Sequence, residues 1–316
     1  MSRSPGSCRS GWVRRGFLVA VLAFGAVFVV GRWDELRAAL ERPSWALVGA
    51  AAVPAAVSIL LSALGWRAML ADLGAPLPAR VAGRVFLLGQ LGKYLPGSVW
   101  SFVAQAELAR DHAVSRRVTV TGSVLGLLLA VGTGVVTAFV TLPFGGGVDA
   151  LRTYWWVVLV VPAGLVFLHP RVVGPLLDRV LRLLRSEPLT RRPSYRGMLT
   201  STGWYALSWV FLGLHCWLLM LGFGAPAAAS LPVAVGGLTL AFCLGLIVVP
   251  APAGAGVREV ALVLAFGPVL GHGASLAVAL ISRIMLTVLD FVLAGAVWAE
   301  QRPRARASGR TKGLRP

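Results

Sequence analysis

The chain has 316 residues, a formal net charge of +18, 57% hydrophobic residues and only 13% charged residues. An ordinary soluble domain carries about 25% charged and about 45–50% apolar residues, so this composition excludes a soluble enzyme, a disordered chain and a collagen-like fibre. A polytopic helical membrane protein remains, because a helix satisfies its own backbone hydrogen bonds inside lipid. The predicted fold class is therefore all-α.

The positive charge is spread over the short segments between apolar runs and over the two tails. This distribution is typical of cytoplasmic loops, so we expect no nucleic-acid partner. Both termini and the loop from Arg171 to Arg196 are predicted to be cytoplasmic, in a multi-pass protein of the plasma membrane. Arg14 and Arg15 resemble part of a twin-arginine signal, but no persuasive cleavage site follows, and we favour an uncleaved first span.

The apolar runs divide into continuous and interrupted ones. A full crossing needs about 20 mostly apolar residues, and the continuous runs predict six full spans, at residues 12–30, 45–66, 118–142, 154–168, 203–222 and 274–298. The regions 81–109 and 231–271 are broken by proline and glycine. We expect each to form a re-entrant helical hairpin; the alternative is that each half crosses the membrane, which gives about eight or more spans.

The order of these elements predicts an inverted repeat, a common plan for transporters. Span, span, hairpin and span follow one another twice with opposite orientation. Repeat one covers about residues 12–142 and repeat two about residues 154–299, within a single transmembrane domain of residues 1–299. Residues 300–316 form a basic cytoplasmic tail.

The first broken region combines helix-breaking residues with charges. Lys93 precedes Pro96 and Gly97, and Glu107 and Arg110 follow later. A helix that restarts after such a break leaves free N–H groups, which attract anions, and Lys93 adds a positive charge beside them. An ionisable residue inside an apolar region is a functional candidate by default, although Lys93 could instead snorkel to the membrane boundary.

The second broken region ends in the sequence PAGAGVRE at residues 252–259. Glu259 in a first helical turn is favoured by the helix dipole, whereas Arg258 there opposes the dipole and requires a carboxylate or a bound phosphate. Arg283 and Asp290 are further charges, seven residues apart on one face of the last span. They could also form a structural pair through an intermediary.

These two regions resemble signatures of the flippase-like membrane family, the transmembrane region of lysylphosphatidylglycerol synthases of the multiple peptide resistance factor type. The stretch KYLPGSVW at residues 93–100 resembles its first signature and residues 252–259 resemble its second. The resemblance extends from the first span to about Trp298. It implies translocation of lipid between leaflets. In this chain, Ser98 to Ala106 separate the first Pro-Gly from Glu107, where family members often have Glu and Arg sooner.

The resemblance and the charges together predict a protein that moves a lipid or lipid-linked precursor with an anionic head group. The partner would be a membrane phospholipid or a polyprenyl-linked lipid. The alternative is a non-transporting membrane partner of a cell-envelope glycosyltransferase or lipid-modifying enzyme. We expect no enzymatic activity, no cofactor and no metal site, because no catalytic constellation is visible and only residues 300–316 follow the last span. The candidate substrate-binding residues are Lys93, Tyr94, Pro96, Gly97, Ser98, Glu107, Arg110, Pro252, Gly254, Gly256, Arg258, Glu259 and Arg283.

Overall fold

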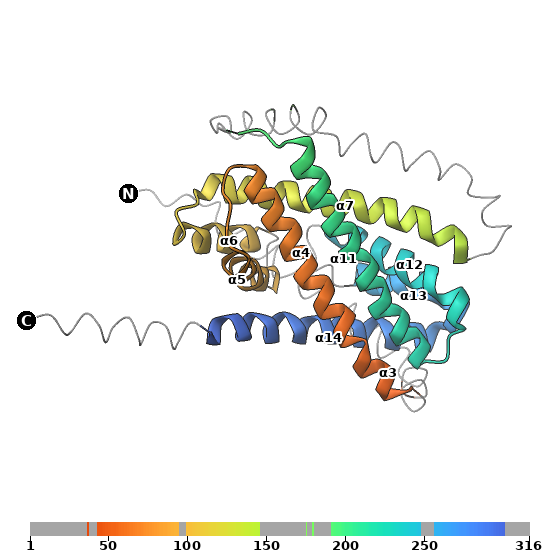
Figure 1. Cartoon of the computed structure of the whole chain (residues 1–316). Helices are drawn as coiled ribbons and strands as arrows, with labels where there is room; N and C mark the ends of the chain where they lie inside the picture. The colour runs from red at the N-terminus through yellow and green to blue at the C-terminus, as the bar shows by residue number, and fades with distance from the viewer. Residues whose placement is uncertain are drawn as a thin grey trace, which may run out of the picture.

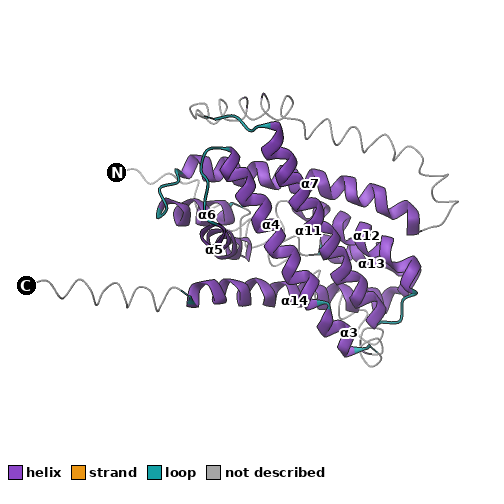
Figure 2. Ribbon diagram, viewed as in Figure 1, coloured by secondary structure: helices purple, strands orange, loops and turns teal. Residues whose placement is uncertain are grey.

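The computed structural model describes residues 43–94, 99–145, 191–247 and 256–300, together with the single residues 37, 175 and 179. Within these residues all regular secondary structure is helical (Figure 2). In chain order the helices are α3 (Trp45–Ala50), α4 (Ala52–Asp72), α5 (Ala79–Gln90), the 3-10 helix η1 (Leu91–Tyr94), α6 (Trp100–Arg110), α7 (Arg116–Gly145), α11 (Tyr195–Gly222), α12 (Ala227–Ile247), α13 (Val257–Leu270) and α14 (His272–Ala299).

Several of these helices can cross a bilayer, which confirms the predicted class of polytopic helical membrane protein. Large apolar side chains such as Leu264, Val53 and Ile284 are exposed on the helices, as expected for surfaces that face lipid. In the described part of the chain, 5 helices are long and apolar enough to span, at Trp45–Asp72, Arg116–Phe144, Tyr195–Gly222, Ala227–Leu246 and His272–Ala299. The predicted spans 12–30 and 154–168 lie outside the described residues.

Each interrupted region forms two helices that pack against each other. In the first, a Cβ placed on Gly92 of η1 would lie 2.6 Å from the backbone nitrogen of Ser101 on α6. In the second, a Cβ on Gly237 of α12 would lie 2.9 Å from the Cβ of Ala265 on α13. Both regions are therefore helical hairpins. They differ in length, because α12 is long enough for a full crossing while α5 and α6 are not.

The helices α4 and α11 pair side by side at the centre of the molecule, and the hairpins α5–α6 and α12–α13 lie toward opposite ends of this pair (Figure 1). Serine hydroxyl groups form hydrogen bonds at the contact between α4 and α11. The Oγ atoms of Ser58 and Ser208 are 3.0 Å apart, and the Oγ of Ser62 is 2.8 Å from that of Ser208. A polar contact that satisfies itself can lie inside a membrane without a charge.

The contacts between α4 and α11 are reciprocal. Ser58 and Ser208 are 150 residues apart in sequence. The same shift relates Ser44 to Ser194 and Asp72 to Gly222. In the structure the Ser44 nitrogen donates to the Gly222 carbonyl at 2.8 Å, and the Ser194 nitrogen donates to Oδ2 of Asp72 at 2.6 Å. The two helices thus relate to each other as in a two-fold interface, with the Ser58–Ser208 contact at its centre.

The turns after the two helices repeat as well. Gly74 follows α4 with a φ of 90° and Gly224 follows α11 with a φ of 87°. Glycine adopts this left-handed conformation without the penalty of a Cβ and so ends a helix sharply. Together with the reciprocal contacts, this is the geometry expected of an inverted repeat. The outer boundaries predicted for the two repeats involve residues outside the described ones and stay a prediction.

Candidate functional site

Both hairpins bring charged side chains to one face of α14. The first supplies Lys93 and Tyr94 from η1, next to the end of α5. The second supplies Arg258 and Glu259 from the first turn of α13. On α14 the receiving residues are Arg283 and Asp290, two helical turns apart and therefore on the same face.

The first hairpin is joined to α14 by an ion pair and a hydrogen bond that share one oxygen. The Nζ of Lys93 lies 2.6 Å from Oδ2 of Asp290, and the Tyr94 hydroxyl donates to the same oxygen at 2.6 Å. The Tyr94 ring also stacks on Phe291, with centroids 5.4 Å apart. The Asp290 side chain is only 4% exposed whereas that of Lys93 is 36% exposed. Asp290 is thus a buried carboxylate whose negative charge is balanced by Lys93 of the first hairpin.

The second hairpin is joined to α14 with the opposite arrangement of charge. Glu259 accepts a hydrogen bond from the Gly256 nitrogen at 2.7 Å, and its other carboxylate oxygen pairs with Arg283. Gly256 has a φ of 84°, which favours glycine at this position. Glu259 therefore lies in the first turn of a helix, as expected, and its carboxylate also caps that turn. The same carboxylate, 11% exposed, also balances Arg283.

Arg258, next to Glu259 in the first turn of α13, is a third cation near these two pairs. It lies close enough to interact electrostatically with Glu259, Arg283, Tyr94 and Asp290. Its guanidinium lies over the ring of Phe242 on α12. Among the described residues, no carboxylate forms an ion pair with Arg258. Three cations and two carboxylates therefore meet at α14, which leaves one positive charge in excess among these residues.

The structure brings together Lys93, Tyr94, Gly256, Arg258, Glu259 and Arg283 from the predicted set. Five other predicted site residues, namely Pro96, Gly97, Ser98, Pro252 and Gly254, lie outside the described residues. Their proposed role in substrate binding stays a prediction. The segments that contain them, 95–98 and 248–255, carry no ionisable side chain, so they add no charge to the cluster.

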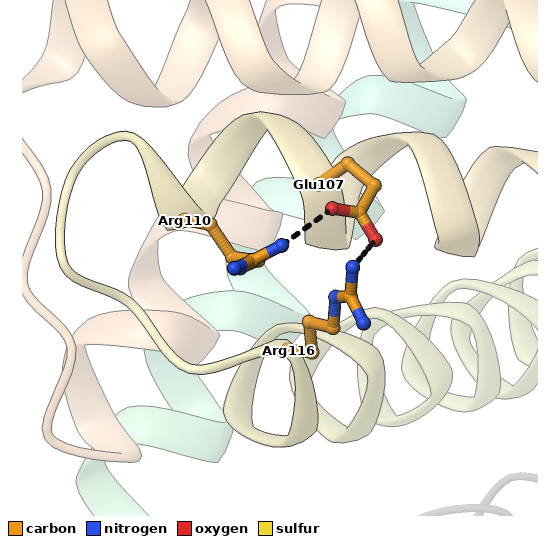
Figure 3. Close-up of polar contacts among 3 residues, drawn as sticks. All are labelled: Glu107, Arg110 and Arg116. Atoms are coloured by element: carbon orange, nitrogen blue, oxygen red, sulfur yellow. Dashed lines mark hydrogen bonds and ion pairs between the residues drawn. The ribbon is translucent and has the colours of Figure 1, made fainter.

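Glu107 and Arg110 form a different group, near the loop that joins α6 to α7 (Figure 3). Oε2 of Glu107 lies 3.1 Å from Nη1 of Arg110, and Oε1 lies 2.5 Å from Nη2 of Arg116. The hydrogen bonds from Arg116 and then Arg110 lower the pKa of Glu107, although partial desolvation opposes them. All three side chains are about half exposed, with 47% for Glu107.

Glu107 is not the carboxylate that pairs with Lys93, although it lies in the same broken region of the sequence. Glu107 lies seven residues into α6, about 10 Å along the axis from the start of that helix. The preceding residues Gln105 and Ala106 point into the protein, so Glu107 points outward. Gln105 accepts a hydrogen bond from Ser123, and Ser123 accepts one from Trp66 Nε1, which fixes the rotation of α6.

Two contributors were absent from the predicted set. Asp290 is visible in the sequence as a charge inside an apolar run, but its pairing with Lys93 depends on the packing of η1 against α14. Phe242 carries no sequence signal, because it is one aromatic residue in an apolar helix. In the described ranges, no three His, Cys, Asp or Glu side chains gather as a metal site requires.

The sequence comparisons agree with the resemblance of the two signatures. The family model described as the lysylphosphatidylglycerol synthase TM region matches residues 16–294. The search of curated proteins found no match. The family match covers most of the chain and includes both hairpins and α14 as far as residue 294. The chain is therefore a multi-pass membrane protein that belongs to the family of the lysylphosphatidylglycerol synthase transmembrane region.

Proposed function

We propose that the protein moves a lipid with an anionic head group between the leaflets of the plasma membrane, without changing it chemically. The observation that carries the proposal is the cluster at α14, where Arg258 has no paired carboxylate among the described residues and one positive charge is in excess. A phosphate bound there would supply the missing negative charge.

The cost of an uncompensated cation supports a bound anion. Arg or Lys at the centre of a membrane helix costs about 2.5–3.5 kcal/mol on insertion scales. A guanidinium also presents a planar set of donors that matches the oxygens of a phosphate. Arg258 lies in the first turn of α13, and the N-terminal end of a helix favours an anion. The head group would bind between the hairpins while its apolar tails stay in the bilayer.

The ion pairs of the two hairpins suggest how a lipid head group could move through the site. Lys93 and Arg283 each pair with a carboxylate of the protein. An arriving phosphate competes with those carboxylates, so ion pairs can exchange as the head group passes from one hairpin to the other. The reciprocal contacts of α4 and α11 supply a pair of helices about which two similar halves can rock.

The proposed orientation places both termini and the start of α11 in the cytoplasm, because basic segments resist translocation. Single cysteines at Arg191 and Ala228, introduced after replacement of Cys8, Cys216 and Cys243, test this placement. Both positions are exposed. An impermeant thiol reagent added to intact cells is expected to label position 228 and not position 191. Labelling of 191 alone would reverse the orientation.

Reconstitution tests the function itself. The full-length protein in vesicles is expected to move labelled phosphatidylglycerol or a labelled polyprenyl phosphate to the outer leaflet, and to move phosphatidylcholine more slowly. Equal movement of all three would contradict a role for the excess positive charge. If no lipid moves while an envelope-biosynthesis enzyme co-purifies with the chain, the non-transporting alternative gains support.

A further inference from the structure

Arg258 differs from the other cations of the site in what balances its charge. Lys93 and Arg283 are paired with carboxylates, whereas the guanidinium of Arg258 lies over the face of Phe242. A ring face attracts a cation through its quadrupole and accepts none of the N–H donors at the edge of the guanidinium plane. The ring therefore stabilises the charge without using those donors, and no carboxylate among the described residues forms an ion pair with them.

We infer that Phe242 is a positioning residue that keeps Arg258 available to an anion. Glu259 and Asp290 both lie within electrostatic range of Arg258. Without the ring, the guanidinium would turn toward one of these carboxylates and its donors would be used internally. Phe242 thus sets how strongly the site binds phosphate, although it does not contact phosphate itself.

The ring is itself held in place by neighbouring helices. Trp209 on α11 packs edge-on against Phe242, with ring centroids 5.7 Å apart and an interplanar angle of 72°. The indole nitrogen of Trp209 donates to the Ala130 carbonyl on α7 at 2.9 Å. A chain of contacts therefore runs from α7 through α11 and α12 to Arg258. This chain fixes the face of Phe242 that Arg258 meets.

Stepwise fluorination of Phe242 tests the inference without changing the shape of the site. Incorporation of 4-fluoro-, 3,5-difluoro- and 3,4,5-trifluorophenylalanine weakens the ring quadrupole in order while the volume barely changes. The full-length chain in nanodiscs is treated with phenylglyoxal, and modification of Arg258 is followed by peptide mass spectrometry with inorganic phosphate as the protecting anion.

The phosphate concentration that gives half-maximal protection of Arg258 is expected to rise with each fluorine. From the unsubstituted to the trifluorinated ring, this phosphate concentration is expected to rise about three- to thirtyfold, the effect of a cation–π contact at a partly buried position. Phe242→Leu gives a change at least as large, and Phe242→Trp retains protection. Equal protection across the fluorinated series, or no protection by phosphate in the unsubstituted chain, would overturn the inference.

The same fluorination at Phe266 provides the matched control. Phe266 lies in the same hairpin and is fully buried, but it packs beside Gly237 in the apolar core. Its fluorination is expected to leave the protection of Arg258 unchanged. The inference rests on the proposed function only in identifying the anion as a lipid head group. If protection by phosphate depends on the ring but vesicles show no lipid movement, the proposed function fails and the role of Phe242 stands.

Discussion

The two hairpins contact the same face of α14, but they do so with opposite charges. The first brings a lysine to a carboxylate on α14, and the second brings a carboxylate to an arginine. The pairing of α4 with α11, by contrast, joins equivalent positions in both directions, although the acceptor is the backbone carbonyl of Gly222 at one end and the carboxylate of Asp72 at the other. Symmetric packing therefore supports an asymmetric site. The halves share their architecture, and the differences between them lie where an anion would bind.

The largest effect is expected at Asp290, the most buried carboxylate of the cluster. Asp290→Asn leaves Lys93 without its counter-charge and weakens the hydrogen bond from Tyr94. Removing one partner of a buried pair costs about 3–5 kcal/mol, and the partial exposure of Lys93 reduces this to about 2–3 kcal/mol. The thermal unfolding of the purified protein measures the loss.

Asp111→Asn provides the control for Asp290→Asn, because Asp111 is an exposed carboxylate at the end of α6, in the hairpin that contacts Asp290. The exchange of charges in Lys93→Asp with Asp290→Lys is expected to recover part of the stability. If the double variant is no more stable than Asp290→Asn, the pair does not join the hairpin to α14.

A smaller loss is expected at the second hairpin. Glu259→Gln removes the charge opposite Arg283 but keeps an oxygen that can accept from the Gly256 nitrogen. We expect a cost of about 1–2 kcal/mol, because the cap is preserved and Arg283 is one-third exposed. A double-mutant cycle with Arg283→Gln measures the coupling between the two residues. Additive losses would show that the pair contributes nothing beyond its parts.

The equivalent residues Ser44 and Ser194 differ in whether their side chains cap a helix. The Ser194 hydroxyl accepts from the Gly197 nitrogen at 3.0 Å and caps α11, whereas Ser44 makes no side-chain cap at α3. Ser194→Ala is expected to cost about 1 kcal/mol, and Ser44→Ala a few tenths of that at most. Denaturant midpoints of the two variants measure the contrast. Equal losses would contradict a stabilising role for the Ser194 cap.

The smallest effect concerns the exposed group at Glu107. Since the arginines lower the pKa of Glu107 below its usual value of 4.5, the folded state gains stability above about pH 4.5. This gain is lost as the pH falls through the lowered pKa. The difference in unfolding temperature between the wild type and Glu107→Gln is therefore expected to be constant from pH 7 to pH 5.5 and to shrink below pH 4.5. A difference that grows on acidification would contradict this account.

Much of the architecture could be predicted from the sequence because it depends on local patterns. The length of each apolar run predicts a membrane span, and proline and glycine inside a run predict a hairpin. Both signals depend only on the residues of the segment itself. The sequence also contains a repeated pattern. Pro43-Ser44 and Pro193-Ser194 begin two segments that end in Gly74-Ala75-Pro76 and Gly224-Ala225-Pro226. This correspondence marks the helices that pair in the structure.

The site could be predicted only in part, because charge pairing depends on contacts between distant segments. The sequence indicated Lys93 and Arg258, but the partner of Lys93 is Asp290, 197 residues later, rather than the closer Glu107. Glu107 does not face Lys93, because the rotation of α6 about its axis points Glu107 outward. That rotation is fixed by hydrogen bonds among Gln105, Ser123 and Trp66, which lie on three different helices. The contact of Phe242 with Arg258 depends on the packing of α12 against α13, which no local pattern in the sequence indicates.

The most direct test compares lipid movement by the Lys93→Gln, Arg258→Gln double variant with that by an Arg110→Gln control in vesicles. All three are cations of the hairpin regions, but Arg110 lies in the exposed group with Glu107. With equal amounts of folded protein, the double variant is expected to lose most of its transport of labelled phosphatidylglycerol, while Arg110→Gln retains the wild-type rate. Full transport by the double variant would contradict the central claim that these cations hold the head group.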